Sequence, residues 1–358
     1  MRHCYFLALL TLCGTALSAQ KFSNEFLSIG VGARAQGMGN AVVALLDDVT
    51  AAAWNPAGLV GDPQLSGLQI GAMHAEWFAG VGKFDYAGVS LPAFRDGRRL
   101  GISFIRFGID DIPNTLSLYE ADGTVNFDNV SSFSAADYAF LLTYAQPISM
   151  KKGRLLVGGN VKVIHRIIGP FAQSWGFGLD AGVQYHRGAW SLAFVGRDLT
   201  STFNAWSFDF TEDEQETLSL TNNEIPINSV EVTRPTLILG VAHRFRFQKV
   251  GVSPELDLFI TTDGRRNVLV SGDPFSIDPA FGLEADYDQF IFLRAGVNQF
   301  QEIAGFDNAT SWQARPALGV GFRLSALQVD YAFSDQTGLE NGYSHVISLM
   351  LHLKKKES

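Results

Sequence analysis

Cysteine is almost absent from this chain of 358 residues, which contains only Cys4 and Cys13. Both lie in the first 19 residues, which have the pattern of a cleavable secretory signal. Arg2 supplies the positive start, an apolar stretch follows, and Leu17-Ser18-Ala19 fits a cleavage site. Cleavage after Ala19 would leave a chain without a disulfide, a cysteine metal ligand or a thiol nucleophile.

Long hydrophobic runs and basic stretches are also missing. No segment after the signal has 18 consecutive apolar residues, so the sequence predicts no transmembrane helix. Apart from Lys354-Lys355-Lys356 there is no basic run, and the net charge is −9, which argues against nucleic acid as a partner. Yet 47% of the residues are hydrophobic and 28 are Phe, so much apolar surface must be buried or shown to lipid.

Catalytic motifs are the third absence. The chain has no G-x-S-x-G, no H-E-x-x-H, no dinucleotide-binding glycine loop and no cluster of Cys and His. Its seven histidines are scattered. We therefore expect no enzyme, no catalytic residue, no metal site and no cofactor.

From about residue 67 onward, apolar residues alternate with polar or small residues with a period near two. In Ser325–Ser334, for example, apolar residues from Leu327 to Phe333 alternate with polar or small residues. One apolar and one polar face is the pattern of a half-buried strand. Fourteen such runs are predicted: 67–74, 84–92, 98–107, 137–147, 153–165, 174–186, 188–198, 235–246, 252–262, 277–287, 290–299, 313–323, 325–334 and 344–353.

The connections between these runs alternate between short turns and longer loops. Such sorting is typical of transmembrane β-barrels, in which closure of the sheet satisfies every backbone amide in lipid. The sequence therefore predicts an all-β fold, a transmembrane antiparallel β-barrel of about 14 strands with both chain ends on the short-turn, periplasmic side. Polar residues of the inward parity would line the lumen: Arg154, Lys162, Arg315, Arg323 and Asp330.

A barrel this wide needs filling, and the segment before the first strand is the natural filler. Residues 20–66 contain many apolar side chains, too many for a disordered tether. We predict three parts: a signal peptide at 1–19, an N-terminal plug or hatch at 20–66 and the barrel at 67–358. Within the plug, Arg34 is expected to face Asp47 or Asp48, and the alternative is a solvated turn.

Residues 26–59 resemble the opening of the PorV/PorQ family of Bacteroidetes-type outer-membrane proteins. That family is in turn similar to the FadL long-chain fatty-acid transporters, with an Asn-Pro-Ala turn in an N-terminal hatch and a 14-stranded barrel. The matching pieces are Gly32-Ala33-Arg34-Ala35, Gly37-Met38-Gly39, Asp47-Asp48 and Trp54-Asn55-Pro56-Ala57-Gly58-Leu59. The resemblance implies a plug motif made of Gly32, Arg34, Gly37, Gly39, Asp47, Asp48, Asn55 and Pro56.

The resemblance implies residence in the outer membrane of a Gram-negative bacterium and two alternative activities. The first is protein contact in type IX secretion, with secretion components or cargo as partners. The second is FadL-like transport of hydrophobic small molecules, with a hydrophobic ligand. In both cases the lipid bilayer surrounds the barrel.

Two predicted loops have an unusual composition, one apolar and one acidic. The loop at 108–136 is more apolar than an idle loop needs, so we regard it as a candidate partner contact through Ile109, Ile112, Leu116, Leu118 and Tyr119. The tract DFTEDEQE at 209–216 is acidic. We interpret it as a solvated surface loop, with a cation site or a contact for a basic partner as the alternatives.

Overall fold

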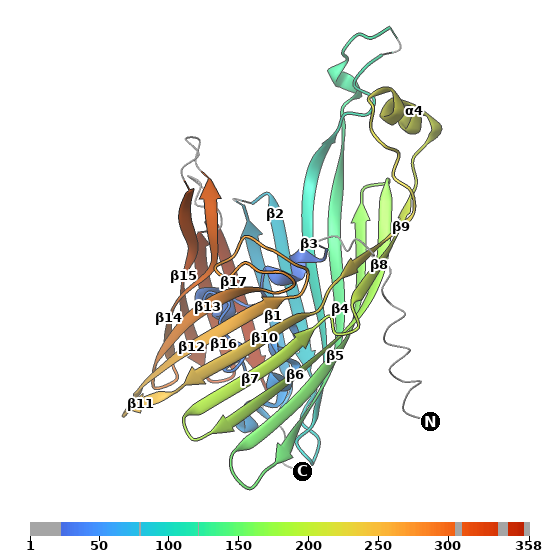
Figure 1. Cartoon of the computed structure of the whole chain (residues 1–358). Coiled ribbons are helices and arrows are strands. Elements are labelled where there is room, and N and C mark those ends of the chain that lie inside the picture. The colour runs from blue at the N-terminus through green and yellow to red at the C-terminus, as the bar shows by residue number, and fades with distance from the viewer. Residues whose placement is uncertain (1–22, 79, 121, 305–309, 336–342, 354–358) are drawn as a thin grey trace.

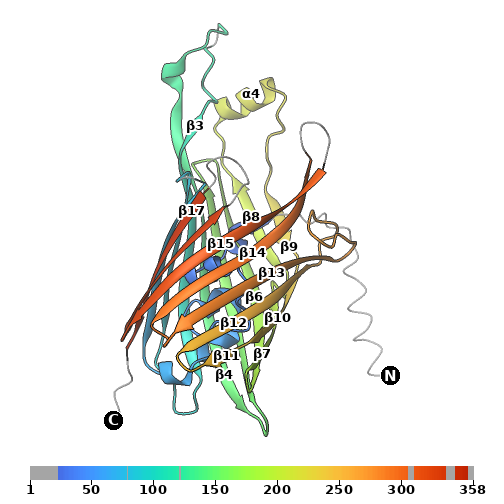
Figure 2. The ribbon, with the colours of Figure 1, turned by 90° about the vertical axis from the view of Figure 1, so that its left-hand side faces the viewer.

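Most of the chain forms one antiparallel sheet that closes on itself. In the computed structural model, β1 (Gln69–Trp77) pairs with β2 (Gly82–Ser90) on one side and with the last strand, β17 (Tyr343–His352), on the other. Figures 1 and 2 show tilted strands that surround the N-terminal part of the chain. The structure describes residues 23–353 except 79, 121, 305–309 and 336–342; the predicted signal peptide lies outside the described residues.

The barrel wall has 14 strand positions, as predicted. Around the ring, β7 and β8 share one position because both pair with β6, and β9, β10 and β11 share the next position. The remaining strands are β3 (Arg99–Asn114), β4 (Ser131–Ser149), β5 (Arg154–Ile168), β6 (Ala172–Arg187), β7 (Trp190–Arg197), β8 (Thr202–Phe208), β9 (Ser229–Thr233), β10 (Thr236–His243), β11 (Phe245–Phe247), β12 (Val250–Thr261), β13 (Ser276–Tyr287), β14 (Ile291–Ala304), β15 (Thr310–Leu324) and β16 (Leu327–Asp335).

Side chains alternate between the two faces of the wall as the sequence predicts. Strand β1 alternates strictly between buried and exposed positions. Inward positions carry polar groups such as Lys162 and Asp330, each 2% exposed. Outward positions carry exposed apolar groups such as Leu318, Ile347 and Leu349. An apolar exterior around a polar interior is the arrangement that a lipid environment favours.

The predicted loop at 199–234 is wrong in part, because it contains β8, β9 and a helix, α4 (Glu212–Leu220). Strand β7 ends at Arg197, and Asp198 and Ser201 adopt positive φ angles of 53° and 56°. This break conceals the alternation that resumes in β8. The acidic tract is helical because Thr211 and Glu214 form a capping box around the first turn.

The predicted sorting of loops also needs correction. Connections 78–81 and 169–171 are short although they were expected to be long, because the flanking strands continue beyond the predicted runs. Likewise, Ile109 and Ile112 belong to β3 and not to a loop. A register shift between these two residues, with Asp111 at φ 57°, interrupts their alternation and explains the error.

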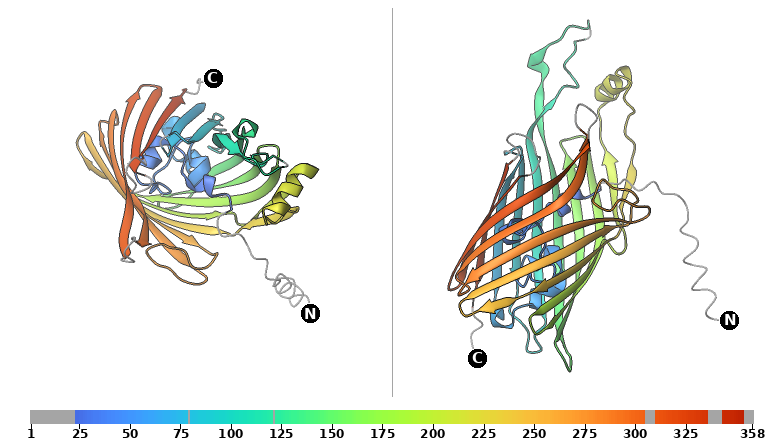
Figure 3. Two further views of the ribbon diagram at one scale, coloured as in Figure 1. Left: turned by 90° about the horizontal axis from the view of Figure 1, so that it is seen from above. Right: turned by 60° about the vertical axis from the view of Figure 1, so that its left-hand side comes forward.

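Short helices make up most of the remaining regular structure. Those of the N-terminal segment, residues 23–66, lie inside the ring of strands when the barrel is seen from above (Figure 3). No helix in the described part of the chain is long and apolar enough to cross a membrane. The short helices are η1 (Glu25–Ser28), α2 (Ala33–Gly37), α3 (Ala51–Trp54), η2 (Pro56–Val60), η3 (Pro63–Leu65) and, outside the segment, η4 (Phe127–Asn129).

Candidate functional site

The N-terminal segment runs along the length of the lumen. At its start, the Asn24 amide donates to the Thr233 hydroxyl of β9 over 2.8 Å, toward the long-loop end of the wall. At its other end, Arg154 of β5 donates to the carbonyl of Gly61 beside the short turns. The sequence predicts this segment within or beneath the barrel on the short-turn, periplasmic side. Inside the lumen the segment also extends to the long-loop end, because the wall supplies hydrogen-bond partners near both ends of the barrel.

Arg34 holds the middle of the segment to the wall through charge. Its Nε and Nη2 atoms donate to the two carboxylate oxygens of Glu284 on β13, over 2.9 Å and 3.1 Å. Its Nη1 lies 2.8 Å from Asp47 Oδ1 and 3.9 Å from Asp48 Oδ2. Both expected carboxylates are therefore near Arg34, and Glu284 is a third that sequence reasoning missed. Burial alone lowers the pKa of Arg34, but Glu284, Asp47 and Asp48 together raise it well above its usual value.

Glu284 is itself shared between two cations. Its Oε2 also accepts from Arg294 Nε over 2.8 Å, and Arg294 Nη1 donates to Asp330 Oδ1 over 2.7 Å. All of these side chains are buried. The network thus joins the N-terminal segment to strands β13, β14 and β16, and it leaves each charge next to an opposite one, as burial requires.

Two carboxylates of β12 hold the backbone of the segment. Asp257 Oδ2 accepts from the amides of Val42 and Val43 over 2.8 Å and 3.0 Å, and Glu255 Oε1 accepts from Ala44 over 2.6 Å. These amides begin a turn and lack partners within the segment. The wall therefore supplies the acceptors that this irregular backbone needs. The inward parity of the two acids was visible in the sequence, but their partners were not.

The glycines of the plug motif allow backbone to touch backbone. Gly39 has a φ of +61°, and a Cβ there would lie 2.5 Å from the amide nitrogen of Val297 on β14. A Cβ on Gly37 would lie 2.9 Å from Gly319 Cα on β15. A Cβ on Gly296 would overlap the backbone of Met38. Glycines therefore face each other across the contact between segment and wall.

The Asn-Pro turn of the motif contacts the opposite wall. Asn55 is fully buried; its amide donates to the carbonyls of Val43 and Val183 over 3.0 Å and 3.2 Å, and its side-chain oxygen accepts from Ala57. A Cβ on Gly158 of β5 would lie 2.5 Å from the carbonyl carbon of Pro56. The remaining motif residue, Gly32, has a φ of +97° and lies near Thr50. The structure thus brings every predicted plug residue into the lumen.

Of the predicted partner-contact residues, Leu116, Leu118 and Tyr119 lie in the connection 115–130 between β3 and β4, apart from the plug residues.

A glycine-to-valine change in the wall should push the backbone of the N-terminal segment away from β14. In Gly296→Val the new side chain has no room beside Met38, so we expect a loss of roughly 1–3 kcal/mol in the free energy of unfolding, as overpacking usually produces. Thermal melting of the purified barrel measures this. Ala72→Val, on the exposed face of β1, is the matched control and should leave the melting temperature unchanged. Equal effects of the two changes would contradict the backbone contact.

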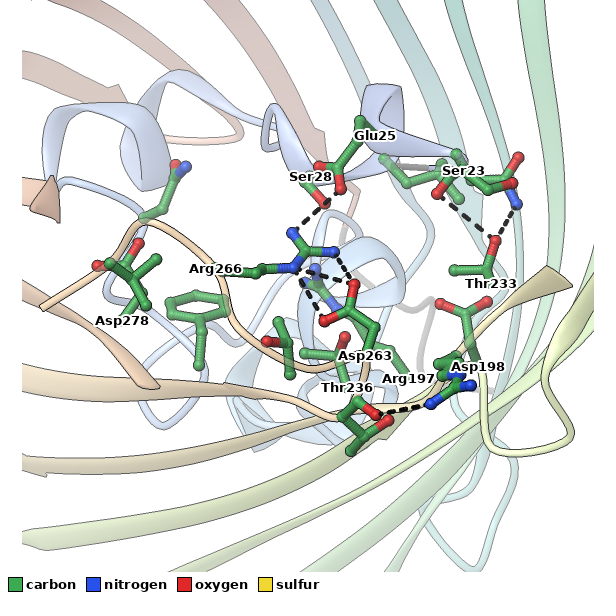
Figure 4. Close-up of a pocket in the computed structure, with 18 of the residues that line it drawn as sticks. Ser23, Glu25, Ser28, Arg197, Asp198, Thr233, Thr236, Asp263, Arg266 and Asp278 are labelled. Atoms are coloured by element: carbon green, nitrogen blue, oxygen red, sulfur yellow. Dashed lines mark hydrogen bonds and ion pairs between the residues drawn. The ribbon is translucent and has the colours of Figure 1, made fainter. Parts of the chain in front are cut away.

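Between the segment and the wall lies a cavity of about 410 Å³ (Figure 4). Part of its lining is apolar and comes from both the segment and the strands: Leu27, Ala53, Trp54, Ile105, Leu141, Phe259, Val268, Pro279 and Ala280. A space of this size matches the lower end of the range for small-molecule sites. The cavity is the site that sequence reasoning did not find, because it combines residues from many separate stretches of the chain, from Ser23 to Gln301.

Several of the charged groups that border the cavity form ion pairs. Arg266, in the loop 262–275, lies 2.7 Å from Asp263 Oδ2 and 3.2 Å from Glu25 Oε1. Burial lowers the pKa of Arg266, but Asp263 and Glu25 raise it above its usual value. Lys162 Nζ lies 2.8 Å from Asp180 Oδ1 and 2.6 Å from Asp198 Oδ1. The charges of Arg266 and Lys162 are thus neutralised locally, while Arg197, Arg234 and Asp278 also line the cavity.

The cavity also adjoins the break in the barrel wall. Arg197 and Asp198, where β7 ends, and Thr233 and Thr236, where β9 gives way to β10, all line it. Arg197 extends over the Trp54 ring, with its guanidinium carbon 5.2 Å from the ring centre. Nearby, the amide of Leu199 donates to the carbonyl of Leu179 on β6 over 2.9 Å in place of regular strand pairing.

Comparison with solved structures identifies the fold. The chain resembles the monoaromatic hydrocarbon channel CymD at 14% identity and a TM-score of 0.57, over 92% of this chain and 99% of that one. It resembles the Pseudomonas putida toluene transporter TodX at 13% identity and a TM-score of 0.54, over 91% of this chain and 99% of that one. It also resembles a Pseudomonas aeruginosa FadL homologue at 11% identity and a TM-score of 0.52, over 89% of this chain and 97% of that one. No protein-family model and no curated protein matches the sequence.

At these identities the likeness establishes a FadL-like barrel fold. Two of the three neighbours are described as a channel and a transporter. The narrower resemblance to the PorV/PorQ family stays a prediction.

Proposed function

We propose that this protein is an outer-membrane barrel that admits small hydrophobic molecules, with residues 20–66 as its plug. The observation that carries the proposal is the cavity, a partly apolar space beside a lumen otherwise filled by the N-terminal segment. The apolar outer face of the strands and the signal-like first 19 residues support an outer-membrane location. The descriptions of CymD and TodX as a hydrocarbon channel and a toluene transporter support the ligand class.

The break between β7 and β8 offers the ligand a path out of the cavity. The break interrupts strand pairing where the cavity reaches the wall. The N-terminal segment, in contrast, blocks a path along the lumen toward the short-turn end. A hydrophobic solute gains by entering lipid and loses by entering water. We therefore propose release sideways through the wall rather than downward past the plug.

Filling the cavity should abolish uptake. Ser28 is exposed and lines the cavity, so Ser28→Trp places a large ring in the ligand space without disturbing a buried contact (Figure 4). We expect uptake of labelled toluene or a labelled fatty acid to fall to the level of cells lacking the protein. Ser149→Trp, at the exposed end of β4, is the control and should transport normally. Normal uptake by Ser28→Trp, or no uptake by the unmodified protein, would reject the proposal.

Type IX secretion is the second candidate function. The observation that favours it is the height of β3 and β4, which rise well beyond the rest of the barrel (Figures 1 and 3). The connection between these two strands contains the exposed apolar residues Tyr119 and Phe127. Contacts with secretion components or cargo would use these residues. Deletion of the gene tests this: a loss of secreted cargo from the cell surface supports it, and unchanged secretion rejects it.

A further inference from the structure

Two projections rise from the long-loop end of the barrel on the same side of it (Figures 1 and 2). We call them the outer arms. The first, residues 109–135, consists of the upper parts of β3 and β4 and their connection, and the second, residues 209–228, contains α4. Neither arm lines the cavity, so their chemistry is separate from that of the proposed ligand path.

The outer arms carry charge of one sign. The first contains five acids, Asp110, Asp111, Glu120, Asp122 and Asp128; the second contains six, Asp209, Glu212, Asp213, Glu214, Glu216 and Glu224. Neither contains Lys, Arg or His. Within the described residues, Asp110 alone among these acids has an ion pair, with Lys83 of β2 at 2.8 Å. The remaining acids have no cationic partner among the described residues, although Glu120, Asp122 and Glu214 accept hydrogen bonds within their own arms.

The arms also expose large apolar side chains among these acids. Phe127 is 77% exposed in the first arm, and Leu220 and Ile227 are 77% and 79% exposed in the second. Solvated loops rarely hold so many large apolar groups in contact with water, and such patches commonly mark protein contacts. Apolar anchors surrounded by charge are the usual composition of a specific interface.

Helix α4 gives an independent indication. None of its residues is buried, so packing contributes little to its stability. A helix of this length is marginal on its own in water, and here the capping box and the acidic first turn are its main local supports. A partner that covered Leu220 would supply the missing packing.

We infer that the outer arms form a docking surface for a protein with a basic face and exposed apolar side chains. Charge complementarity selects this partner: basic residues would pair with the free acids while its apolar groups cover Phe127, Leu220 and Ile227. A second copy of this chain fits less well. Arg98 and Arg99, at the start of β3, and Lys151 and Lys152, after β4, lie at the short-turn end, which the orientation in a membrane keeps on the opposite side. Arg266 lies at the long-loop end, but it is already paired with Asp263 and Glu25.

The first test uses the full-length protein in detergent micelles and a fluorescent helical peptide with a lysine face and a leucine face. We expect this lysine peptide to bind the protein about tenfold or more tightly than a matched peptide with glutamate in place of lysine. Its affinity should fall as added salt screens the charges. Glu212→Gln combined with Asp213→Asn and Glu216→Gln should reduce binding, as should Phe127→Ser combined with Leu220→Ser. The control, Lys151→Gln with Lys152→Gln, should bind as the unmodified protein does. Equal binding by all variants would overturn the inference.

The second test places a photo-reactive residue at position 127 or 220 in living cells. A cross-linked protein that contacts the arms through a basic segment, and that is lost in the charge variant, supports the inference. Cross-links confined to lipopolysaccharide or to a second copy of the chain would overturn it, as would the absence of any adduct. Because uptake through the cavity is measured separately, these outcomes do not depend on the proposed transport function.

Discussion

Removal of residues 26–59 should convert a closed barrel into an open pore. The wall closes by pairing of β1 with β17 and does not depend on the segment for its backbone hydrogen bonds. Without the segment, water would reach the inward charges of β12 to β16, including Asp257, Glu284 and Arg294, and hydrate them. We expect single-channel conductance to rise about tenfold or more, since barrels of more than eight strands leave space that must otherwise be filled.

Planar-bilayer recordings and antibiotic sensitivity of expressing cells measure this effect. Removal of 116–129, from the first outer arm, is the control, because that stretch lies outside the lumen and its loss should leave conductance unchanged. If the 26–59 deletion conducts no more than the control, the segment does not act as a plug.

Replacement of Arg34 by Met should loosen the N-terminal segment without removing it. The change leaves Glu284 with only Arg294 and leaves Asp47 and Asp48 without their cation. Loss of one partner from a buried ion network costs about 3 kcal/mol or more. We expect proteases added from either side to cleave within residues 23–66, and conductance to flicker between closed and open levels.

Arg98→Met provides the matched control. Arg98 pairs with Asp96 at 2.7 Å, but both side chains are about half exposed, so the pair contributes little to stability. This variant should resist protease and conduct as the unmodified protein does. A protease-resistant Arg34→Met variant would show that the glycine contacts and the β12 carboxylates hold the segment without it.

The sequence predicted the barrel well because a lipid-facing wall imposes a local rule on every strand. Alternation in runs such as 325–334 required only that neighbouring residues point to opposite faces, which is a property of the strand itself. The rule failed where backbone geometry broke the repeat, at Asp198–Ser201 and at the bulge near Asp111. Neither break has a strong sequence signal, since positive φ angles there fall on Asp and Ser rather than on Gly.

The candidate site was less accessible to prediction. The contact between Arg34 and Asp47 could be proposed because the two residues are close in sequence and of opposite charge. Glu284 could not, because its approach to Arg34 depends on the curvature of the whole wall. For the same reason the cavity, which joins residues from Ser23 to Gln301, has no signature in any one stretch of the chain.

The position of the N-terminal segment has a consequence for closure of the barrel. The segment bonds to both sides of the seam between the first and last strands: the amide of Ala33 donates to Ser348 on β17 over 2.8 Å, and the Tyr86 hydroxyl on β2 donates to the carbonyl of Val49 over 2.9 Å. It leads directly into β1, so the segment is covalently joined to one side of the seam and hydrogen-bonded to the other. We expect closure of the barrel to involve two surfaces, because β17 contacts both the edge of β1 and the inner segment.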